Sequence, residues 1–282
     1  MATLLILKRR IKTAKNISKT TKAFQMIAAS RLKKAQSAAI SSKPYVEKLD
    51  YLSKGLAQKI DSDNLHEYMK TPTGVSAKLL IVVSPDKGLS GGLVTNLIRE
   101  LMHYSPGGKI YYITIGKKAE TAVSYLNKDI IASFPFGNSL PIFDVVYPLA
   151  KIVNEYFLGK KVSEVKILST KFLSVFTQAP QINTLLPVKH EGESRAINSI
   201  TLFEPNTNEL ISDLLQHYLE MVLYQNLLES YASEQAARMI AMKNATDNAL
   251  DIISELQLEY NKTRQEKITN ELLDIGGGFQ TV

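Results

Sequence analysis

The chain has 282 residues, of which 45% are hydrophobic, and a formal net charge of +7. It contains no cysteine, which excludes disulfides, thiolate metal ligands and a cysteine nucleophile. No run approaches the ~18 uninterrupted apolar residues of a membrane span, and the short N-terminal apolar patch precedes its charges, the reverse of a secretory signal. We therefore expect a soluble, intracellular protein of one or two domains.

Residues 1–57 predict a long coiled-coil helix. Apolar or small residues recur at alternating spacings of four and three, which is the 3.5-residue period of a coiled-coil seam. The seam positions are Leu7, Ile11, Ala14, Ser18, Thr21, Gln25, Ala28, Leu32, Ala35, Ala39, Ser42, Val46, Leu49 and Leu56. Glycine is absent before Gly55, and Pro44 should at most kink the helix.

The middle of the chain, residues 75–200, predicts an inserted α/β domain after a polar loop at 57–74. We expect strands at 77–84, 109–115, 130–134 and 164–170, and helices at 96–104, 116–126 and 141–158. The strand-like stretch 172–186 contains Pro180, which indicates an edge strand or a break. Because buried strands alternate with helices, the domain should be an open, mostly parallel sheet with helices on both faces.

Residues 208–282 predict a second and longer coiled-coil helix, since neither proline nor glycine occurs between Pro205 and Gly276. Its seam positions are Leu214, Tyr218, Met221, Gln225, Leu228, Ala232, Gln235, Met239, Met242, Thr246, Ala249, Ile253, Leu256 and Tyr260. A helix of this length would be roughly 100 Å long and could not bury its seam against a compact core. The N-terminal helix is the partner of similar length. A compact insert would bring the chain back antiparallel, although the sequence alone leaves the direction open.

Charge is distributed unevenly between the two helices. Residues 1–43 carry eleven Lys or Arg and no acid, whereas residues 209–282 carry five bases and twelve acids. Opposite charges favour pairing of the two helices with each other. Nucleic-acid binding by the basic helix is the less favoured alternative, because Phe24 is the only aromatic residue of that stretch that could stack on a base.

One loop has the composition of a phosphate-binding loop. Residues 88–93, Gly-Leu-Ser-Gly-Gly-Leu, lie between a predicted strand and a predicted helix, but they match neither common phosphate-loop pattern. A tight turn explains these glycines more simply. The histidines, His66, His103, His190 and His217, have no metal-ligand spacing. We expect no catalytic residue, cofactor or metal.

Polar residues within the C-terminal seam are unusual. Gln225, Gln235 and Thr246 occupy core-type positions with Arg238 beside them, and buried polar groups of this kind fix helix register. The end of this helix outlasts the N-terminal helix. Such a projecting end needs a socket in a partner.

Three parts of the chain resemble the gamma subunit of F-type ATP synthase. Residues 233–249 and 256–272 are similar to the C-terminal signature of that family, residues 11–35 to its opening helix, and residues 84–96 to its central loop. Because these stretches lie at both ends and in the middle, the resemblance covers essentially the whole chain.

The resemblance implies a rotor: the central stalk of a proton-translocating ATP synthase. In that family an antiparallel coiled coil stands inside a hexamer of alternating alpha and beta subunits, and the insert contacts the epsilon subunit and the membrane c-ring. Rotation driven by the ring forces the catalytic beta subunits through open, loose and tight states. The chain itself would be non-catalytic, bind no nucleic acid, and lie peripherally on the cytoplasmic face of a bacterial inner membrane, because it lacks a transit peptide. The ring decides whether the ion is H⁺ or Na⁺.

The resemblance also assigns partner contacts by position in the motifs. Those matching contacts to a beta-subunit catch loop are Arg264, Gln265 and Thr269. Those matching the segment that faces the acidic lever of the beta subunits are Lys22, Phe24 and Met26. Those matching the motif on the opposing helix are Glu234 and Arg238. Those expected in an apolar sleeve of the hexamer are Leu272, Leu273, Ile275 and Phe279.

The insert departs from the family pattern at three positions. Pro85, Lys87 and Ser90 stand where the family often has a small hydroxyl residue, arginine and a small thiol. Two other classes of function stay open at this point. Nucleotide binding by residues 75–200 alone would support an enzyme, and salt-sensitive DNA binding by the N-terminal helix would support a nucleic-acid-binding coiled coil.

Overall fold

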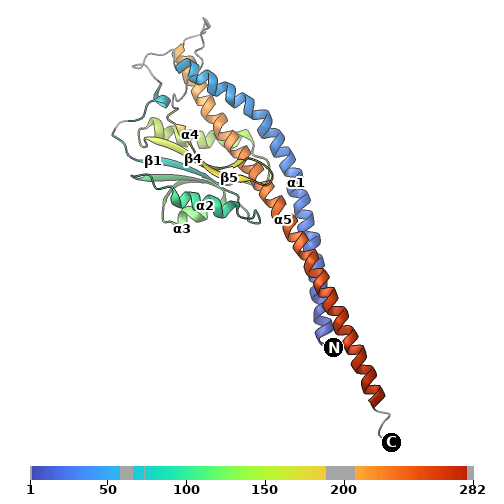
Figure 1. Ribbon diagram of the computed structural model, residues 1–282. Helices are drawn as coiled ribbons and strands as arrows, with labels where there is room; N and C mark the ends of the chain where they lie inside the picture. Colours follow the sequence, from blue (N-terminus) through green and yellow to red (C-terminus); the bar gives the residue numbers. More distant parts are fainter. Residues whose placement is uncertain (1, 58–65, 73, 189–206, 278–282) are drawn as a thin grey trace. The chain divides into compact units, whose positions relative to one another are not determined.

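The computed structural model describes residues 2–57, 66–72, 74–188 and 207–277 (Figure 1). They form two compact units, which we call the coiled-coil unit (residues 1–28 and 238–282) and the head unit (residues 29–237). Helix α1, Ala2–Ala57, and helix α5, Thr207–Gly277, each run through both units. None of the described helices is both long enough and apolar enough to cross a membrane.

In the coiled-coil unit, α1 and α5 pack antiparallel. The hydroxyls of Thr21 and Thr246 are 2.7 Å apart, while Lys8 and Ile11 share a hollow with Gln257, so numbers rise along one helix as they fall along the other. The described residues of this unit that are buried are Leu7, Ala14, Ser18, Ala28, Met242, Thr246, Ala249 and Ile253. All of them are predicted seam positions, because the 3.5-residue period keeps one stripe of each helix facing the other.

The same two helices continue antiparallel in the head unit. The Tyr218 hydroxyl donates to Asp50 Oδ1 at 2.9 Å, and the Gln225 side-chain amide donates to the Ala39 carbonyl at 3.3 Å. Burial, and then the Asp50 carboxylate, raises the pKa of Tyr218 well above its ordinary value. Helix α1 passes through Pro44 without a break.

The rest of the head unit is a five-stranded sheet in the order β3-β2-β1-β4-β5. The strands are β1 Lys78–Val83, β2 Ile110–Ile115, β3 Asp129–Phe134, β4 Glu164–Phe172 and β5 Gln178–Leu186. The first four are parallel, and β5 is an antiparallel edge strand. The prediction of an open, mostly parallel sheet is confirmed, and Pro180 lies in the edge strand that it indicated.

Among the described residues, the strands are connected by helices α2 Leu93–His103, α3 Lys117–Tyr125 and α4 Val146–Leu158. The 3-10 turn η2 Glu67–Met69 precedes β1, and η3 Phe143–Val145 precedes α4. Helices α2 and α3 cover one face of the sheet and α4 lies on the other (Figure 1). Helix α2 begins three residues before the predicted start, whereas α4 begins five residues after its own, because η3 takes up the preceding segment.

The core lies around the central strand β1. Leu80 and Val82 pack with Leu97 of α2 and with Val123 of α3, and none of these four side chains is more than 1% exposed. The intervening residues of β1 point to the opposite face and are equally buried. Each such side chain contributes about 1.5–3 kcal/mol on burial. Because both faces of β1 are buried, apolar residues occupy successive positions and the strand is a continuous apolar run.

Gly116, between β2 and α3, has a backbone conformation that favours glycine. Its φ is 95°, and an added Cβ would overlap the Ser84 carbonyl. Gly116→Ala is expected to lower the free energy of unfolding by about 2 kcal/mol or more, from backbone strain and steric overlap. Gly88→Ala is the matched control, because a Cβ there meets open space. Equal losses in urea unfolding for the two variants would contradict this account.

A charge cluster at the beginning of β4 should make stability depend on pH. Burial alone would raise the pKa of Glu164, but hydrogen bonds from Lys166 and Lys78, both at 3.2 Å, together bring it below its ordinary value. A lowered pKa gives stability that is present above the ordinary pKa and lost as the pH falls through the folded-state value. Glu164→Gln should therefore destabilise the protein in urea unfolding at neutral pH and much less at about pH 3. A difference that is the same at both pH values would refute this.

Candidate functional site

In doubly wound sheets, phosphates bind beyond the carboxyl ends of the strands, beside the N-terminus of a helix. In this chain, internal side chains already occupy the first amides of α3. Asp86 Oδ1 accepts from the Lys117 amide at 2.9 Å, and Ser84 Oγ accepts from the Ala119 amide at 2.6 Å. The other oxygen of Asp86 accepts from the Gly137 amide at 2.7 Å. A bound phosphate would have to displace a carboxylate from this position.

The glycine-containing loop at 88–93 is a turn. Leu89 and Gly91 both have positive φ values, 64° and 57°, and the Leu93 amide donates to the Ser90 carbonyl at 3.3 Å as α2 begins. The turn interpretation of these glycines therefore agrees with the backbone. Within the described ranges, no group of three or more His, Asp or Glu side chains could hold a metal ion.

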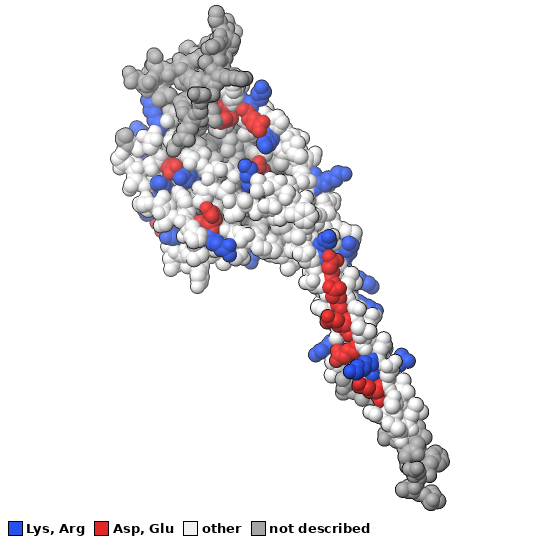
Figure 2. All heavy atoms as spheres, viewed as in Figure 1, with Lys and Arg blue, Asp and Glu red and all other residues white. Residues whose placement is uncertain are grey.

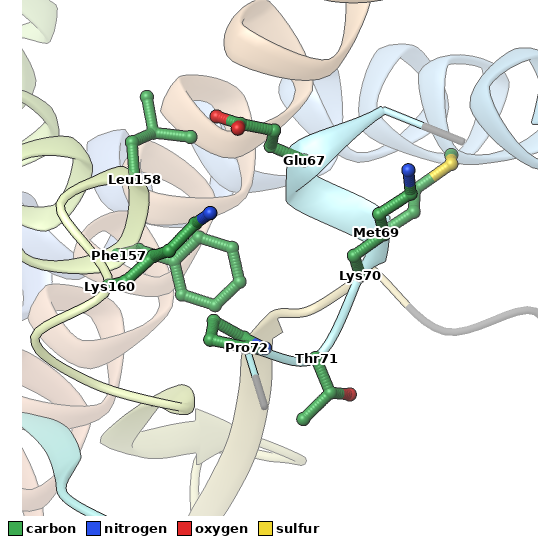
Figure 3. Close-up of a pocket in the computed structure, with 8 residues that line it drawn as sticks. All are labelled: Glu67, Met69, Lys70, Thr71, Pro72, Phe157, Leu158 and Lys160. Carbon is green, nitrogen blue, oxygen red and sulfur yellow. The ribbon is translucent and has the colours of Figure 1, made fainter. Parts of the chain in front are cut away.

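A cavity of about 640 Å³ lies in the head unit between η2 and the end of α4 (Figure 3). Phe157 and Leu158 contribute an apolar wall, while Lys70 and Lys160 make the rim basic beside the single carboxylate of Glu67. One carboxylate between two lysines is not a divalent-cation site.

Exposed apolar side chains characterise the coiled-coil unit. Phe24 is 45% exposed, Met26 59%, Leu272 64% and Leu273 66%. A groove of about 710 Å³ also runs between the two helices, floored by Ala14 and Ala249 and edged by residues such as Ile6, Arg9 and Ile252. These exposed apolar side chains are candidates for contact with a partner.

Acidic side chains of α5 form a row along its outer face. Asp247, Asp251, Glu255 and Glu259 follow one another at intervals of four residues, and all are exposed (Figure 2). One hydrogen bond between the helices of this unit joins neutral hydroxyls, those of Thr21 and Thr246. The acidic row therefore faces outward rather than into the seam.

The structure places the sequence-predicted contact residues in three groups. The first group consists of predicted contact residues on α1, all of which are exposed: Lys22, Phe24 and Met26. The second group consists of predicted contact residues in the last turns of α5, which are also exposed: Arg264, Gln265, Thr269, Leu272 and Leu273. Ile275 lies in α5, but its side chain is outside the described residues, as is all of Phe279. The third group differs, since Glu234 is 3% exposed and Arg238 is half-buried, and both interact within the chain.

A polar face of α5 in the head unit was not predicted from the sequence. Ser169 of β4 donates to Asn226 Oδ1 at 2.8 Å, and Ser230 and Ser233 bond to the backbone of Thr170. The available signal was the spacing of four and three between Asn226, Ser230 and Ser233, which places three small polar residues on one helix face. That face is distinct from the seam toward α1.

An α/β head inserted in sequence between two long antiparallel helices, with apolar side chains exposed on those helices and the first amides of α3 bonded to internal side chains, defines a stalk-like subunit. Solved structures share the fold. The rotor of the Euglena gracilis mitochondrial ATP synthase matches with a TM-score of 0.68 at 19% identity, covering 95% of this chain and 99% of that one. An OSCP/F1/c-ring structure from the same organism matches with a TM-score of 0.72 at 20% identity, covering 99% and 94%.

Sequence comparison identifies the family. The model of a family described as ATP synthase matches residues 3–282. The ATP synthase gamma chain of Dehalococcoides mccartyi strain CBDB1 is 37% identical over 280 residues, covering 99% of this chain and 98% of the relative. That of Ruthia magnifica is 36% identical over 283 residues, covering 98% of each. The chain belongs to the gamma-chain family of F-type ATP synthases, as its sequence motifs indicated.

Asp86 is expected to stabilise the carboxyl end of the sheet, where it bonds the start of α3 and the segment after β3. In Asp86→Asn, one oxygen that accepts backbone hydrogen bonds becomes an amide donor facing another donor. The free energy of unfolding should fall by about 1–3 kcal/mol. Urea unfolding measures this, and Asp144→Asn, at an exposed position in η3, is the control. If Asp86→Asn behaves like the control, the hydrogen bonds of Asp86 do not hold this edge.

Proposed function

We propose that this chain is the central-stalk rotor of a proton-translocating F-type ATP synthase, coupling rotation of the c-ring to conformational change and ATP synthesis in the beta subunits. Membership of the gamma-chain family is the observation that carries the proposal. Solved structures of similar fold are described as a rotor and as a central stalk with its c-ring. The chain itself is non-catalytic in this proposal.

The proposed partners contact different units of the chain. The alpha and beta subunits surround the coiled-coil unit, whose exposed Phe24, Met26 and Leu272 are apolar surface that such a sleeve would bury. The epsilon subunit and the c-ring contact the head unit. In this arrangement the chain is divided into an N-terminal coiled-coil helix (1–57), an inserted α/β domain (75–200) and a C-terminal coiled-coil helix (208–282).

Coupling without catalytic groups follows from binding thermodynamics. A partner shifts a conformational equilibrium only by its difference in affinity for the two states. The side chains of the coiled-coil unit differ around its circumference, with an acidic row on one face of α5 and basic residues on α1 (Figure 2). Each angle of rotation then presents a different surface to a given beta subunit and stabilises a different conformation of its site.

The same proposal locates the chain on the cytoplasmic face of a bacterial inner membrane, held there peripherally through the c-ring. The lack of a membrane-crossing helix among the described residues is compatible with attachment through a partner. Co-expression with alpha and beta subunits tests the proposal. It requires a stoichiometric complex with ATPase activity, and failure of these subunits to assemble around the chain would reject it.

The last turns of α5 supply a specific test. Arg264 and Gln265 are exposed donors, proposed to bond acceptors on a beta-subunit loop. Replacing both by alanine should lower coupled turnover of the assembled complex by about threefold or more, because one hydrogen bond to a charged group contributes about 1.5–3 kcal/mol. The isolated chain should unfold at the same urea concentration as the wild type.

A matched control is available on the same helix. Lys262 and Asn270 are also exposed, and their replacement by alanine removes a charge and an amide at positions outside the assigned contacts. Wild-type turnover in the Arg264/Gln265 variant, or an equal loss in the control, would exclude a specific contact at these residues.

A further inference from the structure

Helix α5 and strand β4 meet in a buried polar contact. Its members are Ser169 and Thr170 of β4 and Asn226, Ser230 and Ser233 of α5, and we call this set the β4–α5 joint. All five residues are between 0% and 7% exposed. Contacts between a helix and a sheet are mostly apolar, so a row of hydrogen bonds here requires a physical reason.

The joint begins where the parallel ladder ends. Strand β1 pairs with β4 only as far as Leu168. Beyond that point, the Thr170 amide donates to Ser230 Oγ at 3.3 Å, and the Thr170 carbonyl accepts from Ser233 Oγ at 3.2 Å. Two side chains of α5 therefore bond the N–H and C=O groups of Thr170, as the backbone of a neighbouring strand would.

The end of the β1 ladder makes these two bonds necessary. The N–H and C=O of one strand residue point to the same side, so those of Thr170 point away from its cross-strand neighbour Pro180 in β5 and toward the side on which β1 has ended. An unpaired backbone group at a buried position costs about 1–3 kcal/mol. The bonds to Ser230 and Ser233 satisfy both backbone groups of Thr170, so they tie α5 to this one residue of the sheet.

The third bond fixes the same helix face. Ser169 donates to Asn226 Oδ1 at 2.8 Å, and the Asn226 amide donates back to the Val222 carbonyl at 2.8 Å. Because Nδ2 is held by its own helix, Oδ1 is oriented toward β4. The Asn226 side chain is thus constrained from both ends.

Hydrogen bonds resist a motion that apolar contacts permit. Apolar burial is non-directional, so a helix can turn or slide on an apolar surface at little cost. Hydrogen bonds need defined distances and angles. A turn of α5 by one residue, about 100°, would break all three bonds together and leave buried groups unpaired.

Two tyrosines hold another face of α5 to the segment between β3 and α4. The Tyr231 hydroxyl donates to the Asn138 carbonyl at 3.1 Å, and the Tyr224 hydroxyl donates to the Pro141 carbonyl at 3.2 Å. The Tyr231 ring also packs on Phe136 with centroids 6.2 Å apart. Like the joint, these contacts oppose rotation of α5 about its own axis.

We propose that the β4–α5 joint is the element through which torque passes between the inserted domain and helix α5, with Asn226, Ser230 and Ser233 as positioning residues. The inference rests on the proposed rotor function. A ring that turns the inserted domain delivers work only if α5 turns with it. The three buried, directional bonds of the joint meet that requirement by holding α5 to β4.

The test separates torque transmission from stability. The complete ATP synthase containing Ser230→Ala with Ser233→Ala is reconstituted in liposomes, and ions pumped per ATP hydrolysed are measured. ATPase activity is also measured in the complex with alpha and beta subunits alone, where no torque has to reach a ring. We expect the pumping ratio to fall by about twofold or more, because the bonds that resist slippage are lost, while ATPase activity of the ring-free complex stays at the wild-type level.

The matched control is Ser163→Ala with Ser174→Ala. These serines also form hydrogen bonds with backbone groups, Ser163 to Ala77 and Ser174 with Thr177, but within the inserted domain and not to α5. The control should keep the wild-type ratio. A second pair covers misfolding of the double variant: Ser169→Ala should lower the ratio, and Ser169→Thr, which keeps a hydroxyl, should restore it.

Several results would overturn the proposal. They are a wild-type ratio in both joint variants, an equal fall in the control, or pumping and hydrolysis that decline in parallel in the ring-free and complete complexes. Failure of the wild-type chain to form an ATPase-active complex with alpha and beta subunits is a separate outcome. It rejects the rotor function itself and is observed before any variant is made.

Discussion

Burial of helix α5 on all sides is the constraint on which the head unit depends. A helix of a two-stranded coiled coil buries one stripe, yet every residue from 230 to 236 is buried. Helix α1 covers the seam, β4 covers the polar face, and the segment after β3 covers a third face through Tyr224 and Tyr231. Since each neighbour requires a different set of side chains, one orientation of α5 about its axis satisfies all of them.

The coiled-coil unit has the opposite character. Its seam is narrow and built largely from small residues, with Ala14, Ala28 and Ala249 buried, so the two helices approach closely and leave long side chains such as Phe24 and Leu272 exposed. A chain of this kind acts through its surface. Its effect on a partner depends on which face the partner meets, and this dependence is the physical basis of coupling in the proposed rotor.

The sheet edge illustrates why the fold alone does not define the activity. The strand order and the glycine-containing turn are those of a doubly wound domain, in which helix amides commonly bind phosphate. Here the carboxylate of Asp86 and the hydroxyl of Ser84 accept amide hydrogens at the start of α3. These bonds join the end of β1 to α3, and Asp86 also bonds the segment after β3.

Much of the architecture could be read from local patterns. The 3.5-residue period predicted the buried seam residues of the coiled-coil unit, the continuous apolar run predicted β1, and Pro180 indicated an edge strand or a break. The contact surface was predicted only through family motifs, because exposed residues such as Arg264 carry no periodic signal of their own. The joint was missed, because Ser230 and Ser233 acquire a role only when Thr170, some sixty residues away, loses its strand partner.

The sequence by itself determined which residues form helices and strands and which stripe of each long helix is apolar, because these properties depend on side chains a few positions apart. The tertiary structure alone decided the antiparallel direction of the helices, the order of the strands, the hydrogen bonds of Asp86 and Ser84 to the start of α3, and the partner of the polar face of α5. Each of these depends on how segments far apart in the sequence pack together, which residues a few positions apart do not specify.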